Sequence, residues 1–154
     1  MDARTLHALV PIAIVAGLIL SGYAWYESTH PAAQGSCSIN GFVSCSKVDT
    51  SAHTTTLGIS DYWFGIAGFL GLLVLDIPLL RTYKPGWLYA LFALSTVGVV
   101  FALYFAYVEL AVINALCLIC TGAYLSNAVV WLAALGLVWE QRSPVRDDDP
   151  EKGA

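Results

Sequence analysis

The chain contains four long runs of apolar residues, and shorter polar segments separate them. A helix needs about 20 mainly apolar residues to cross the hydrocarbon core of a membrane. The runs predict four membrane-spanning helices, at about residues 6–26, 58–80, 86–108 and 115–138. We expect one four-helix domain over residues 1–140, with an outer loop at residues 27–57, and a charged tail at residues 141–154. The predicted fold is an all-α integral membrane protein, a four-transmembrane-helix bundle with an extracytoplasmic loop between helices one and two.

The composition agrees with a membrane protein and excludes two other classes. Hydrophobic residues make up 58% of the chain and charged residues only 12%. A soluble domain carries roughly 25% charged residues, so an ordinary soluble globule is excluded. A nucleic-acid-binding protein shows a basic surface, whereas the net charge here is −4. We therefore expect membrane lipid, and no nucleic acid, among the partners.

The basic residues predict the orientation of the bundle, because cytoplasmic segments beside membrane spans are enriched in Lys and Arg. With both termini in the cytoplasm, only Lys47 lies outside. The cytoplasmic side then holds the remaining basic residues, Arg4, Arg81, Lys84, Arg142, Arg146 and Lys152. The long loop and the turn near Asn114 are expected on the extracytoplasmic side. Asp76 precedes Arg81 near the cytoplasmic interface, where we expect it to be solvated or ion-paired.

All four cysteines fall on the predicted outer side. Cys37 and Cys45 lie in the loop, and Cys117 and Cys120 form a C-x-x-C pair at the start of the fourth helix. Residues three apart share one face of a helix, so the two sulfurs of this pair can meet. The amino end of a helix also stabilises a thiolate, which is the species that attacks disulfides. The spacing therefore predicts a closable pair with one activated member.

Three interpretations of the cysteines are open. Two static disulfides would suit an exported loop, but a C-x-x-C pair partly inside a span adds little as a structural link. Four thiolates could bind zinc or a soft metal, but the C-x₇-C spacing is unlike that of common metal sites. A redox relay uses both pairs, and it is the interpretation we favour: the loop pair meets a soluble thiol, and the inner pair passes electrons into the lipid.

Such a relay needs an acceptor that takes two electrons within the membrane, and a quinone has these properties. A quinone site would be an apolar cavity with one or two polar groups that bind the carbonyl oxygens. Tyr124 lies one turn beyond Cys120 on the same face, and its hydroxyl could donate to such an oxygen. From position alone, Tyr124 could equally be a packed or interfacial aromatic residue.

Together these residues resemble the vitamin K epoxide reductase family, in particular its prokaryotic thiol-oxidising members. The resemblance extends from about residue 6 to residue 140. The matching segments are Cys37-x₇-Cys45, Ser44-Cys45-Ser46-Lys47-Val48, Phe64-Gly65 and Cys117-Leu-Ile-Cys120-Thr-Gly-Ala-Tyr124. The resemblance implies four helices around a quinone, capped by a loop that carries two cysteines.

The resemblance also implies a role for each cysteine. Cys37 would accept attack by the thiol of a partner protein, and Cys45 would carry the exchange inward to Cys117. Cys120 would face the quinone ring. No resident metal is expected in this arrangement.

Further site residues follow from the resemblance. Tyr124 matches a tyrosine that hydrogen-bonds a quinone carbonyl, Phe64 matches an aromatic residue of the pocket, and Ser51 matches a loop Ser or Thr near the redox cysteines. Vertebrate members have an asparagine where this chain has Asp61. An ionised carboxylate cannot donate a hydrogen bond. Either Asp61 is protonated, or Ser60 takes its place, or the register differs.

The implied activity is that of a quinone-dependent oxidoreductase that oxidises a thioredoxin-fold partner and so supports disulfide formation in exported proteins. The quinone would be of the menaquinone, ubiquinone or phylloquinone type. We expect no fused thioredoxin-like domain, so the partner would be a separate protein. Reduction of vitamin K epoxide or quinone is an alternative activity with the same cysteines. Carriage of a soft metal is an alternative of another class.

Overall fold

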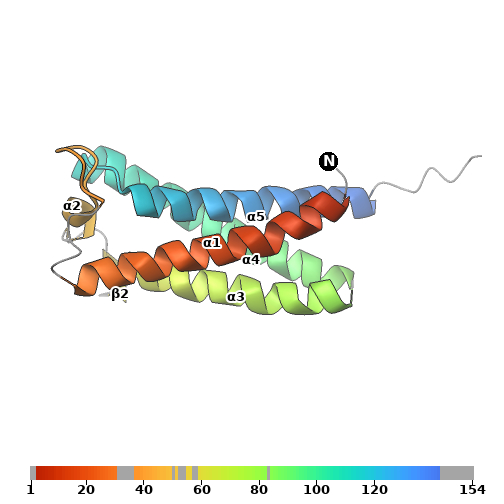
Figure 1. Cartoon of the computed structure of the whole chain (residues 1–154). Coiled ribbons are helices and arrows are strands. Elements are labelled where there is room, and N and C mark those ends of the chain that lie inside the picture. The colour runs from red at the N-terminus through yellow and green to blue at the C-terminus, as the bar shows by residue number, and fades with distance from the viewer. Residues whose placement is uncertain are drawn as a thin grey trace, which may run out of the picture.

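Four long helices pack side by side in one bundle (Figure 1). The computed structural model describes residues 3–30, 37–49, 51, 55–56, 59–82 and 84–142. The long helices are α1 (Ala3–Thr29), α3 (Asp61–Arg81), α4 (Pro85–Tyr107) and α5 (Leu118–Arg142). Each is long and apolar enough to cross a membrane. The predicted all-α membrane bundle is therefore confirmed. Most of the predicted charged tail, from residue 143 onward, lies outside the described residues.

Small residues allow the helices of the bundle to approach closely. The buried core draws on all four helices, with Ile14, Phe69, Leu91 and Val130 among its members. A methyl group added to Gly17 of α1 would overlap the ring of Phe69 on α3. Contacts of this kind stabilise helix pairs in lipid, where the hydrophobic effect does not drive association.

Of the two environments predicted for Asp76 at the cytoplasmic interface, solvated or ion-paired, the solvated one is wrong, because the residue is buried. Only 2% of this residue is exposed. Among the described residues, its Oδ2 atom has no hydrogen-bond partner, and His7 is the ionisable group that acts on it electrostatically. The reason for the difference is the helix face: Asp76 points toward the interior between Leu72 and Leu79, which are also buried.

The turn into the last helix occurs at Asn114, as predicted. After Tyr107 the chain continues as a short π-helix, η2 (Val108–Ile113). Asn114 then adopts a left-handed conformation with φ 51°, which Asn tolerates better than most residues. Its N–H donates to the carbonyl of Glu109, and so does the N–H of Ala115. This closed turn sets where α5 begins.

The loop between α1 and α3 folds against the start of α5. It contains a short helix, α2 (Cys45–Asp49), and two short antiparallel strands, β1 (Thr55–Thr56) and β2 (Ile59–Ser60). Just before α2, the N–H of Ser44 donates to the carbonyl of Leu116, and the N–H of Leu116 donates to the carbonyl of Phe42. These two backbone hydrogen bonds connect the loop cysteines to the C-x-x-C helix.

Candidate active site

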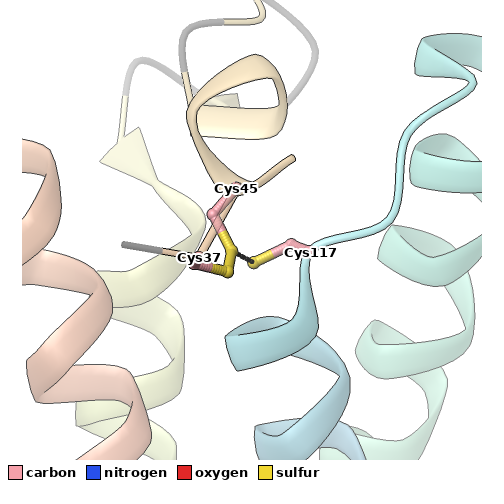
Figure 2. A group of neighbouring side chains, drawn as sticks. All are labelled: Cys37, Cys45 and Cys117. Atoms are coloured by element: carbon pink, nitrogen blue, oxygen red, sulfur yellow. Dashed lines mark hydrogen bonds between the residues drawn. A yellow bond between two sulfur atoms is a disulfide. The ribbon is translucent and has the colours of Figure 1, made fainter. Parts of the chain in front are cut away.

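The loop cysteines Cys37 and Cys45 lie against Cys117, just before α5 (Figure 2). Cys37 forms a disulfide with Cys45, and Cys117 forms one with Cys120. The sulfur of Cys117 lies 3.4 Å from the sulfur of Cys45, and the sulfurs of Cys37, Cys45 and Cys117 all lie within 4.8 Å of one another. Cysteines that are 72 positions apart in the chain are thus in van der Waals contact.

This arrangement orders the sulfurs for thiol–disulfide exchange. Exchange proceeds by attack of a thiolate on one sulfur of a disulfide, which forms a mixed disulfide. Cys45 and Cys117 are the two cysteines in contact across the pairs. The backbone N–H of Cys120 donates to the sulfur of Cys117 at 3.2 Å, which favours a thiolate at that position. The geometry therefore suits a bond between Cys45 and Cys117 as the link between the pairs.

A cavity of about 390 Å³ lies between the four long helices, next to Cys120. Cys120, Tyr124, Phe64 and Asp61 all contribute to its lining. Most of the remaining lining is apolar, including Leu72, Leu94, Val97, Phe101, Phe105 and Ile119. A largely apolar cavity of this size with a few polar groups fits a small aromatic ligand. The residues present therefore fit the ring of a quinone.

Cys120 lies between the cysteine cluster and the cavity. A second, much smaller gap of about 30 Å³ is lined by Cys45, Cys117 and Cys120, and also by Asp61. Cys120 and Asp61 line both spaces. Of the four cysteines, Cys120 is the one that reaches the large cavity. It is thus placed to pass electrons from the sulfur cluster to a ligand in the bundle.

The other predicted site residues are divided between the cavity and the loop. Asp61 begins α3, and its carboxylate accepts the backbone N–H of Tyr62 at 2.7 Å. Ser60 ends strand β2 and is not among the described residues that line the cavity. Ser51 follows α2, where its N–H donates to the carbonyl of Val48. The structure thus brings Asp61, Phe64 and Tyr124 together around the cavity, and leaves Ser60 and Ser51 outside it.

Glu109 was expected from the sequence only as a capping residue of the outer turn, but it belongs to the site. It belongs to η2 and is only 3% exposed. Its Oε1 accepts a hydrogen bond of 2.7 Å from the hydroxyl of Tyr124, and its Oε2 accepts one of 3.1 Å from the backbone N–H of Cys117. A signal was present in the sequence, because Glu109 is the only charged residue between Lys84 and Glu140. Ionisable residues within membrane spans commonly have functional roles.

The comparison with known families agrees with this site. A family model described as the vitamin K epoxide reductase family matches residues 8–135. This range includes all four cysteines, Glu109 and the residues named above around the cavity. The chain therefore belongs to the vitamin K epoxide reductase family. Membership indicates a multi-pass membrane oxidoreductase whose cysteine pairs take part in thiol–disulfide chemistry related to quinones.

Proposed function

Because the chain belongs to this family, we propose that it transfers electrons from a thioredoxin-fold partner protein to a membrane quinone. In doing so it would regenerate the disulfide of the partner and support disulfide formation in exported proteins. The observation that carries the proposal is the 3.4 Å contact between the sulfurs of Cys45 and Cys117. Through this contact the two cysteine pairs can exchange a disulfide.

The first half of the reaction occurs at the loop. A thiolate of the reduced partner attacks Cys37 and forms a mixed disulfide, and Cys45 leaves as a thiolate. The second thiol of the partner then attacks the partner's own sulfur in the mixed disulfide. This step releases the oxidised partner and leaves Cys37 and Cys45 reduced. Two electrons and two protons have passed from the partner to the loop pair.

The second exchange moves the electrons inward. The thiolate of Cys45 attacks Cys117, which forms a Cys45–Cys117 disulfide and releases Cys120 as a thiolate. Cys37 then attacks Cys45, which restores the loop disulfide and releases Cys117. The loop pair is oxidised again and the pair on α5 is reduced, so no net electrons are lost or gained.

The cavity supports a quinone as the final acceptor. A quinone takes up two electrons and two protons and becomes a quinol. Cys120 would face the ring, Phe64 would pack against it, and Tyr124 and Asp61 are the polar side chains available for its oxygens. Menaquinone, ubiquinone and phylloquinone all have a ring of this kind on an isoprenoid chain that can extend into the lipid.

We also propose that the cysteines face the extracytoplasmic side and that both termini are cytoplasmic. The described basic residues support this orientation. Arg81, Lys84 and Arg142 belong to the end of the bundle at which α3 ends, α4 begins and α5 ends, and Lys47 belongs to the opposite end (Figure 1). An excess of Lys and Arg is typical of the cytoplasmic side.

One observation favours a second candidate function. Three sulfurs within 4.8 Å of one another could bind a soft metal ion if the cysteines were reduced. In the structure, however, all four cysteines are in disulfides, and a disulfide offers no thiolate. A soft-metal carrier would contain stoichiometric metal after purification in a reduced state, and it would not reduce quinone.

The test uses the purified full-length protein in lipid nanodiscs, with dithiothreitol as electron donor and a short-chain ubiquinone as acceptor. We expect the wild type to reduce the quinone, and we expect Cys120→Ser to abolish this reduction. In Cys120→Ser kept free of dithiothreitol, Cys117 can attack Cys45 of the loop disulfide and release Cys37 as a thiolate, so a Cys45–Cys117 disulfide should accumulate and be detectable by mass spectrometry. Leu118→Ser is the matched control, since Leu118 lies on the same turn but is exposed.

Two results would contradict the proposal. One is a wild-type protein that leaves the quinone oxidised although its cysteines are reduced. The other is a Cys120→Ser variant that reduces quinone as fast as the wild type. An assay with vitamin K epoxide as substrate would separate the quinone-dependent activity from epoxide reduction, because both use the same cysteines.

A further inference from the structure

The hydrogen bond between Tyr124 and Glu109 determines what Tyr124 can offer a ligand. A tyrosine hydroxyl has one proton to donate, and an ionised carboxylate can only accept. In the structure the hydroxyl donates to Oε1 of Glu109 at 2.7 Å, a normal length for a strong O–H···O bond. While Glu109 is ionised, Tyr124 therefore presents only acceptor lone pairs to the cavity.

The oxidised and reduced forms of a quinone need different hydrogen-bonding groups around them. The carbonyl oxygens of the oxidised form accept hydrogen bonds, whereas the hydroxyl groups of a quinol can also donate them. Tyr124 lines the cavity, and Glu109 is not among the described residues that do so. Tyr124 can donate to a carbonyl oxygen only if Glu109 is protonated and donates to Tyr124 in turn. The protonation state of Glu109 thus sets whether the site suits the quinone or the quinol.

We propose that Glu109 is the positioning residue that supplies a proton, through the hydroxyl of Tyr124, to one oxygen of the quinone. This inference rests on the proposed function. Glu109 gives its proton to Tyr124 as Tyr124 gives its own to the carbonyl oxygen, so Tyr124 ends with the same number of protons. The Tyr124–Glu109 hydrogen bond then returns to the arrangement seen in the structure, which suits the quinol.

The protons and electrons balance with those of the cysteine pair. Oxidation of the Cys117–Cys120 dithiol to a disulfide releases two electrons and two protons. Both electrons pass to the acceptor. One proton restores the carboxylic acid of Glu109, whose Oε2 contacts the backbone N–H of Cys117 at 3.1 Å. The other proton goes to the second oxygen of the quinone. Glu109 therefore contacts both the backbone of a cysteine whose thiol releases a proton and the tyrosine that delivers one.

The substitution Glu109→Gln separates proton supply from hydrogen bonding. The glutamine amide has the same shape as the carboxyl group. Its oxygen can accept from Cys117, and its NH₂ group can donate to Tyr124, but it cannot release a proton. Tyr124 is then free to donate to a carbonyl oxygen. We expect Glu109→Gln to keep or increase the affinity for oxidised quinone while it slows quinone reduction.

The experiment measures both quantities on full-length protein in nanodiscs. The first is the single-turnover rate at which pre-reduced protein reduces a short-chain ubiquinone. The second is the dissociation constant of that ubiquinone on the oxidised protein, from quenching of tryptophan fluorescence. A proton donor contributes typically about 10²–10⁴-fold to a rate, so we expect Glu109→Gln to lose at least about 100-fold in rate. The matched control Glu140→Gln, at an exposed position on α5, should change neither quantity.

Tyr124→Phe provides a second and independent variant. It keeps the aromatic ring but removes the hydroxyl, so both the rate and the affinity for oxidised quinone should fall. If Glu109 and Tyr124 form one path, the double variant should be no slower than Tyr124→Phe alone. Tyr124→Phe also remains informative if Glu109→Gln does not fold.

Failure of the inference is distinguishable from failure of the proposed function. A wild-type protein that does not reduce quinone overturns the proposed function and with it the inference. A wild-type protein that reduces quinone, together with an equally fast Glu109→Gln variant, overturns only the proton path. A larger loss of rate in Asp61→Asn than in Glu109→Gln would also overturn it, because the proton would then come from the carboxylate that lines the cavity.

Discussion

The carboxylate of Glu109 accepts the backbone N–H of Cys117 at 3.1 Å, so one acidic side chain holds the first cysteine of the C-x-x-C pair. The same carboxylate accepts the hydroxyl of Tyr124. The substitution Glu109→Ala leaves both donors without this acceptor in a buried place. An unsatisfied buried donor costs about 1–3 kcal/mol, and we expect a loss of stability of at least this size.

Thermal unfolding of Glu109→Ala in detergent checks this prediction. For a chain of this length, 1 kcal/mol corresponds to a shift of about 2–4 °C in the midpoint. Glu140→Ala is the control, since Glu140 is exposed near the end of α5. If Glu109→Ala unfolds at the temperature of the wild type, the two hydrogen bonds do not contribute to stability.

A disulfide should form spontaneously between Cys45 and Cys117 when the other two cysteines are removed. The double variant Cys37→Ser with Cys120→Ser leaves only these two, and their sulfurs lie in contact. Because no large movement is needed, we expect most of the folded protein to become crosslinked under mild oxidation. Mass spectrometry of a proteolytic digest identifies the bond. The same variant in denaturant serves as the control and should crosslink far less.

Replacing Cys45 should trap the partner on Cys37. In the proposed order, Cys37 forms a mixed disulfide with the partner before Cys45 is involved again. Without Cys45, Cys37 is a free thiol that forms this bond by attacking the disulfide of the oxidised partner, and the exchange cannot continue to Cys117. The trapping experiment therefore uses the oxidised form of the partner. We expect Cys45→Ser to accumulate a partner adduct that a non-reducing gel detects, and Cys37→Ser to accumulate far less. An active partner that forms no adduct with Cys45→Ser would contradict this order.

The close approach of α1 and α3 should depend on Gly17. A methyl group at this position would overlap the ring of Phe69. Overpacking a well-packed interior costs typically about 1–3 kcal/mol, so Gly17→Ala should lower the free energy of unfolding by that amount. Gly22→Ala is a matched control on the same helix, where the added methyl group meets no atom within 4 Å. Equal unfolding midpoints of the two variants would show that α1 can move away from Phe69 without cost.

The bundle and the cysteine chemistry could be predicted because their signals are local. Long uncharged runs identify membrane spans from composition alone. The C-x-x-C spacing specifies that Cys117 and Cys120 share a helix face, and the loop pair Cys37 and Cys45 can be paired with it from the family resemblance. The predicted position of Tyr124 beside Cys120 depends only on helical periodicity, and both residues line the same cavity.

The partners of Glu109 could not be predicted because they depend on tertiary geometry. Glu109 lies in a π-helical segment, where α-helical periodicity no longer gives the direction of a side chain. The left-handed turn at Asn114 then reverses the chain and brings Tyr124 back toward Glu109.

Asp76 is a similar case. Because Asp76 is close in sequence to Arg81, we expected it at the membrane interface. Its burial depends on which face of α3 meets α1, and the sequence pattern does not specify that face.

The backbone hydrogen bonds from Ser44 and Leu116 join the loop to the start of α5 without involving any sulfur atom. The contact between the loop and the start of α5 is therefore made in part by backbone groups that take no part in the redox chemistry. If the proposed function holds, a protein built in this way would connect a water-soluble electron donor with a lipid-soluble acceptor through contacts that are already formed before either binds. Its turnover rate would then be limited by how often the partner protein and the quinone bind, rather than by a slow conformational change.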